Sequence, residues 1–198
     1  MHNCTQNKGM VKKYGISLGI GLLLALFLIA TVTSYIHEKP VHIASMMVQD
    51  VAQLKEIFER IEKTCGILSF DYQANPINFL TIKKDGFVGS EIGSMNLAYP
   101  QQWQGPYLLD NPTMQNKEYE VVSTSKGYFI VPGRGVKLPN GKIVGVDIIL
   151  DENADIVAMM SDQNKLMFDG KPLAAALVTE KTVINSPFIA ALVRDDGQ

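Results

Sequence analysis

The residues of this chain that could do chemistry gather in one acidic segment. Asp151, Asn153 and Asp155 stand at alternate positions, which is the spacing of oxygen ligands in a calcium-binding loop. Position six of such a loop would be Ile156 instead of glycine, and position twelve would be the shorter acid Asp162. These departures favour the polar turn of a β-hairpin over a calcium site. We therefore expect no cofactor and keep calcium as the alternative.

The residue types of the common catalytic sites are missing around that segment. The three histidines are His2, His37 and His42, so residues 66–198 contain none to serve as a base or a metal ligand. The sequence also has no HExxH, GxSxG or Walker loop. A pair of carboxylates could still act as in glycosidases, but no two acids are set apart from turn positions. We expect a protein that is not an enzyme.

The overall charge argues against a nucleic-acid partner. The 198 residues include 18 Lys and Arg and 20 Asp and Glu, for a net charge of −2. Backbone phosphates attract basic surfaces, and this chain is weakly acidic. Its apolar content of 46% is enough to form a folded core.

The apolar residues are concentrated near the amino terminus. Residues 14–36 contain no charge and would measure about 34 Å as an α-helix, slightly more than a bilayer core of ~30 Å. Lys8, Lys12 and Lys13 precede the run, and positive residues favour the cytosolic side. We therefore expect a cytosolic tail (1–13), a transmembrane helix (14–36) and an external remainder. A cleaved signal peptide is the alternative, although its apolar region is usually only ~7–15 residues long.

Small residues within the span are spaced for close contact between helices. Gly15 and Gly19 form one small-xxx-small pair, and Ser17 and Gly21 form another. This spacing lets two helix backbones approach closely in a membrane. We expect these four residues to pack against another helix.

An amphipathic helix is expected over residues 37–65. Apolar residues recur there at three- and four-residue intervals, with charged residues between them. Pro40 should kink this long helix or break it into two. We expect the apolar stripe to pack on a folded head together with two aromatic residues further along the chain; these residues are Val51, Leu54, Ile57, Phe58, Ile61, Trp103 and Tyr107.

The head, residues 66–198, is predicted to be strand-rich, because glycine, proline and asparagine separate short apolar runs. The predicted fold class is therefore α+β, a long helix packed on an antiparallel sheet. The predicted strands are 77–82, 119–123 and 128–131, with hairpins joining 136–138 to 143–150 and 156–160 to 165–168. Two helices are expected at 172–178 and 188–194.

One segment near the start of the strand-rich half resembles a known motif. It reads Trp103-Gln104-Gly105-Pro106-Tyr107-Leu108, and it follows a single helix that begins apolar and becomes amphipathic. Together these features resemble the type IV pilin-like proteins, especially the pseudopilins of type II secretion. In that family the motif is a turn packed on the long helix, here Trp103, Gly105, Pro106 and Tyr107. The peptidase cut would fall between Gly15 and Ile16, and Ile20 stands where the family has glutamate.

The resemblance implies a structural subunit of a type II secretion or type IV pilus-type envelope assembly. It would be a single-pass protein of the bacterial inner membrane with a periplasmic head. Its partners would be the membrane and other pilin-like subunits or envelope proteins. The alternative is a membrane-anchored periplasmic module that binds or interacts with another molecule and is likewise not an enzyme.

Overall fold

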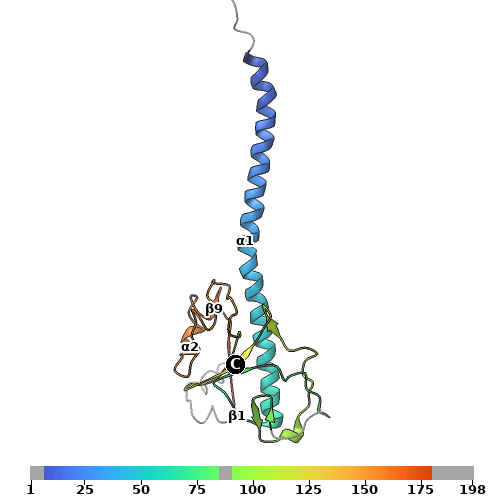
Figure 1. The fold of residues 1–198 in the computed structure, drawn as a ribbon, viewed down its shortest axis with the longest axis vertical. Coiled ribbons are helices and arrows are strands. Elements are labelled where there is room, and N and C mark those ends of the chain that lie inside the picture. The colour runs from blue at the N-terminus through green and yellow to red at the C-terminus, as the bar shows by residue number, and fades with distance from the viewer. Residues whose placement is uncertain (1–6, 85–90, 180–198) are drawn as a thin grey trace, which may run out of the picture. The chain divides into compact units, whose positions relative to one another are not determined.

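A computed structural model describes residues 7–84 and 91–179 (Figure 1). The predicted fold class is confirmed: a long apolar amino-terminal helix packs against antiparallel β-sheets. The chain divides into two compact units, Met1–His42 and Ile43–Gln198. Each unit is described separately below.

The helix α1, Asn7–Cys65, contains both predicted helical stretches. Pro40 lies inside it without ending it, so of the two outcomes expected at this residue a break into two helices is wrong. Proline removes one backbone donor, and the bonds on either side keep this long helix intact. The helix ends at Gly66, whose φ of 64° is a left-handed value that glycine adopts without steric cost. The Gly66 N–H bonds to the Glu62 carbonyl at 2.9 Å.

In the first unit, α1 exposes its apolar side chains. Every residue from 19 to 35 is exposed, including Leu26 at 58% and Phe27 at 66%. Within the part of the chain that the structure describes, α1 is the one helix long and apolar enough to cross a membrane. The hydroxyls of Thr31 and Thr33 donate to carbonyls three and four residues earlier. This satisfies their polar groups within the helix, as a lipid environment requires.

The second unit has one hydrophobic core, and α1 supplies one side of it. The apolar stripe of α1 packs against the inner faces of the sheets. Phe58 is fully buried, with its ring centroid 6.3 Å from that of Phe70 and 6.1 Å from that of Phe79. The aromatic contacts show that the helix packs directly on the strands and loops that follow it.

Two antiparallel sheets form most of the second unit. One has the order β1-β4-β3, and the other has the order β11-β8-β7-β2. Two small hairpins, β5–β6 and β9–β10, complete it. The strands are β1 (Ile67–Phe70), β2 (Ala74–Pro76), β3 (Glu91–Ile92), β4 (Met95–Leu97), β5 (Thr113–Met114), β6 (Lys117–Glu118), β7 (Glu120–Thr124), β8 (Gly127–Val131), β9 (Met167–Phe168), β10 (Lys171–Pro172) and β11 (Ala175–Leu177).

The hairpin predicted from residues 119–131 is confirmed. Strands β7 and β8 pair in the antiparallel sense, with Val121 opposite Ile130 and Thr124 opposite Gly127. Both strands are rich in β-branched and aromatic residues, and the two-residue connection contains Ser125 and Lys126. A strong strand composition and a short polar connection together make such a hairpin easy to predict.

Four other predicted elements differ from the structure. Residues 77–82 form a buried turn region instead of a strand. Residues 143–150 contain only isolated bridges, although Lys137 does pair with Ile143 beside the predicted turn. Residues 156–159 form a short helix, α2 (Ile156–Met159), which replaces one arm of the second hairpin. Residues 172–178 are extended, because β11 pairs with β8.

Each of these corrections reflects tertiary context. Asp155 caps α2 by accepting the Ala158 N–H, which marks a helix start. The apolar run at 156–160 had instead favoured a strand in the sequence. The alanine-rich segment at β11 completes a sheet edge, and pairing overrides its helix propensity. The helix predicted at 188–194 lies outside the described residues.

Candidate functional site

The structure buries the apolar stripe of α1 in the second unit. Val51, Leu54, Ile57, Phe58 and Ile61 are each at most 5% exposed and belong to one core cluster. Trp103 is fully buried in the same cluster, and Tyr107 is half-buried against it. The residues expected at the contact between helix and head are therefore brought together in the folded protein.

The segment that contains Trp103 and Tyr107 forms a compact turn. The two rings meet edge to face, with centroids 4.8 Å apart and an interplanar angle of 81°. The Trp103 Nε1–H donates to the Ile82 carbonyl at 3.0 Å, and the Tyr107 N–H donates to the Leu80 carbonyl at 2.8 Å. The turn is thus fixed to residues 80–82 by both side-chain and backbone bonds.

Position 105 of this turn has no space for a side chain and therefore requires glycine. A Cβ atom there would collide with the Ile82 carbonyl oxygen and with Trp103 Nε1. The peptide bond between Gly105 and Pro106 is cis. Burial raises the pKa of the Tyr107 phenol, so the ring stays neutral and packs as an apolar group.

A hydrogen bond between α1 and the sheet region was not predicted from the sequence. The fully buried Tyr119 donates its hydroxyl proton to Asp50 Oδ2 at 2.8 Å. Burial, and then the neighbouring Asp50 carboxylate, hold the pKa of Tyr119 far above its usual range. The available signal was the position of Asp50, which is three residues after Met47 and four before Leu54 and therefore borders the buried stripe.

Cys65 ends the stripe with a buried thiol. It is a free, fully buried thiol, and burial raises its pKa. A raised pKa leaves little of the reactive thiolate at neutral pH. The side chain therefore acts as a small apolar core residue.

The glycines expected to mediate helix contacts lie within α1. A Cβ added at Gly19 or Gly21 would meet nothing within 4 Å, so neither glycine is needed for packing within the described part of this chain. Gly15 and Ser17 are also in the helix.

The acidic segment is used for local turns. Asp151 Oδ1 accepts the Asn153 N–H at 3.0 Å, while Asp155 caps α2 and accepts a bond from Lys126. The Lys126 ammonium, and then the Ala158 N–H, lower the pKa of Asp155. Over the residues described, no three His, Cys, Asp or Glu side chains come together as they would around a metal ion.

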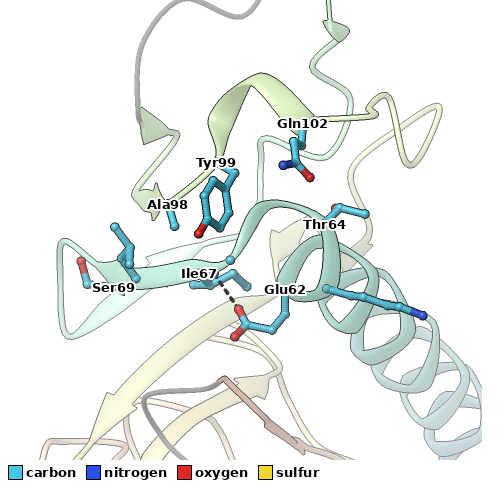
Figure 2. Close-up of a pocket in the computed structure, with 10 residues that line it drawn as sticks. Glu62, Thr64, Ile67, Ser69, Ala98, Tyr99 and Gln102 are labelled. Carbon is cyan, nitrogen blue, oxygen red and sulfur yellow. Dashed lines mark hydrogen bonds between the residues drawn. The ribbon is translucent and has the colours of Figure 1, made fainter.

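A groove in the second unit runs beside the carboxyl-terminal end of α1 (Figure 2). It has a volume of about 740 Å³, within the usual ~300–1,000 Å³ range of ligand pockets. Its walls come from α1, β1 and the 3₁₀ helix η2 (Pro100–Gln102). The side chains that give it chemical character are Glu62, Lys63, Leu68, Ser69, Tyr99 and Gln102.

The side chains of the groove are held by neighbouring backbone. Glu62 Oε2 accepts the Ile67 N–H at 2.6 Å, the bond drawn in Figure 2. The Tyr99 N–H donates to the Cys65 carbonyl at 2.7 Å. No sequence motif indicated this groove, because its residues come from two separate segments, 62–69 and 98–102.

Comparison of the chain with protein-family models, with curated proteins and with solved structures found no match. The function therefore has to be inferred from the geometry. What it defines is a protein with one apolar amino-terminal helix and a folded α+β unit built on that helix.

Proposed function

We propose that this chain is a non-enzymatic structural subunit, similar to a pseudopilin, of a type II secretion or type IV pilus-type envelope assembly. One observation carries the proposal. The helix α1 exposes apolar side chains on every side over residues 19–35, and the same helix continues into the stripe that forms the core of the second unit. A single element thus has an apolar surface that needs lipid or protein around it and a folded unit fixed to its other end.

Membrane insertion accounts for the exposed apolar surface. A solvated surface of this size would be strongly unfavourable, whereas lipid would cover it at no such cost. Tyr35 and Lys39 stand at the end of the apolar run, with the ammonium 5.8 Å from the ring centroid. Tyrosine and lysine are common at membrane interfaces. In the proposed arrangement the preceding lysines stay in the cytosol and the folded unit is periplasmic.

The proposed subunit acts by positioning and not by catalysis. The buried stripe, the Trp103–Tyr107 turn and the Tyr119–Asp50 bond fix the helix to the head. In the proposed assembly the membrane segment packs with other helices, and the folded unit contributes to the surface of the assembly. The buried thiol and the locally bonded acids offer no group suited to chemistry.

Crosslinking in native membranes tests the structural role. Single cysteines at Gly19 or Leu26, in a Cys4→Ser background, should form disulfides with a second copy or with a partner after mild oxidation. Both positions are exposed, so a cysteine there can reach a neighbour without unfolding. A cysteine at the exposed Lys171 serves as the control for random collision. Monomeric protein from both span positions would refute an assembly of helices.

The second candidate is a membrane-anchored binding module, and the groove beside α1 favours it. In that case α1 serves only as a tether, and the second unit recognises a molecule in the periplasm. Binding by protein that remains monomeric in the membrane would select this candidate. The mass of the membrane-extracted chain distinguishes these two candidates from a protein whose apolar run is a cleaved signal peptide, because cleavage would remove the apolar span.

A further inference from the structure

We propose that the groove formed by α1, β1 and η2 is a binding site for a neutral saccharide chain, with the Tyr99 ring as the surface on which a sugar ring stacks. This inference goes beyond the proposed structural role and does not depend on it.

The charges of the groove favour an uncharged ligand. Glu62 and Lys63 are adjacent in sequence and both line the groove, so the lining carries one negative and one positive charge. An anionic ligand would meet the Glu62 carboxylate, and a cationic ligand would meet the Lys63 ammonium. Neither sign is favoured by the side chains present.

The polar groups of the groove suit hydroxyl groups. The hydroxyls of Ser69 and Tyr99 and the amide of Gln102 can each donate and accept hydrogen bonds. Sugar hydroxyls have the same double capacity. In Figure 2 the side chains of Tyr99 and Gln102 come from one wall, with Tyr99 over the strand that contains Ile67 and Gln102 near Thr64 at the end of α1. A ligand between these walls can bond to both.

Two large apolar side chains are exposed within the groove. Tyr99 is 54% exposed and Leu68 is 51% exposed, and both line it. A sugar ring offers C–H faces between its hydroxyls, and such a face packs on an aromatic ring while the hydroxyls remain free to bond. The backbone that carries Tyr99 is held in place, since its N–H donates to the Cys65 carbonyl at 2.7 Å and its carbonyl accepts the Gln102 N–H at 3.0 Å.

A peptide strand is a poorer occupant than a saccharide. Strand β1 lies at an edge of its sheet, and an added strand would need the outward backbone donors of β1. The Ile67 N–H already donates to Glu62 Oε2. One backbone donor that an added strand would need is therefore already occupied.

The test uses the full chain in lipid nanodiscs, because maltoside detergents carry sugars that would compete. The neutral probes are maltopentaose, cellopentaose and chitopentaose, and the charged control is a galacturonic acid oligomer. Saturation-transfer NMR should detect transfer to the ring protons of at least one neutral probe, with a saturable response. The acidic oligomer should give none.

Variants connect the binding to the groove. Tyr99→Ala should weaken binding about tenfold, the loss expected when one aromatic contact is removed, and Gln102→Ala should weaken it as well. Tyr72→Ala is the matched control, because Tyr72 is 67% exposed and does not line the groove. Unchanged melting of all three variants shows that they are folded, as expected for exposed side chains.

The proposal is overturned if no neutral probe binds, if Tyr99→Ala binds as well as the unmodified chain, or if the acidic oligomer binds better than every neutral one. These outcomes are independent of the crosslinking result. A chain that crosslinks through its helices can fail to bind a saccharide, and a chain that does not crosslink can bind one.

Discussion

Replacing Trp103 with alanine should strongly destabilise the second unit. The side chain is fully buried, packs edge to face on Tyr107 and donates to the Ile82 carbonyl. Alanine would remove the ring, the aromatic contact and the hydrogen bond together. It would also leave a cavity beside Gly105, whose backbone has no side chain to fill the space.

The expected loss follows from these contacts. Truncation of a buried tryptophan to alanine costs about 3–5 kcal/mol, and the unsatisfied Ile82 carbonyl adds about 1 kcal/mol or more. We therefore expect the free energy of unfolding to fall by at least about 4 kcal/mol. Domains of this size have only ~5–15 kcal/mol in total, so the variant should lose a large share of the stability of the second unit.

The assay has to report on the second unit alone. Trp103 is the only tryptophan in the chain, so fluorescence cannot follow its variants, and the 59-residue α1 would dominate a helix signal. Pulse proteolysis over a urea series, in nanodiscs, measures instead how much of the head is cleavable at each concentration.

Trp103→Phe serves as the matched variant. It keeps an aromatic ring against Tyr107 but removes the N–H donor, so its loss should be about 1–2 kcal/mol. If Trp103→Ala costs less than about 1 kcal/mol, or no more than Trp103→Phe, the turn does not hold the head together and the reasoning fails.

Four further changes probe the same unit by the same proteolysis assay. Ile57→Asp should cost about 4 kcal/mol or more, because it places a charge in the core; a stable variant would mean that α1 does not pack there. Gly133→Ala should cost about 2–3 kcal/mol, since its Cβ would collide with the Glu118 carbonyl. Gly141→Ala, at a φ of 86° with open space around it, should cost only about 1–2 kcal/mol, and equal losses would contradict this account. The pKa of Tyr119 is raised in the folded state, so the stability that this residue contributes is complete below the ordinary tyrosine pKa of 10.0 and is lost as the pH rises above that value. Between pH 9 and pH 11, Tyr119→Phe should therefore lose less stability than the unmodified chain. Equal losses for the two proteins would reject this linkage.

Much of the candidate site could be anticipated from the sequence. Residues 51–61 repeat apolar side chains at helical spacing, and only one face of a helix can satisfy that spacing. Trp103 and Tyr107 are large rings beside a Gly-Pro pair, a combination that predicts a packed turn. The Tyr119–Asp50 bond could not be predicted, because the two residues are 69 positions apart and neither is unusual in its own segment.

By itself, the sequence determined the elements whose pattern is local: the charge-free run, the striped helix, its end at Gly66 and the β7–β8 hairpin. These depend on spacing and on the conformational preference of single residues, which neighbours in the chain can specify. Only the tertiary structure decided that residues 77–82 form a turn, that 175–177 form a strand and that Tyr99 and Glu62 line the same groove. Those outcomes depend on which segments meet in space, and the free energy of pairing and burial there exceeds the weak local preferences of the residues involved.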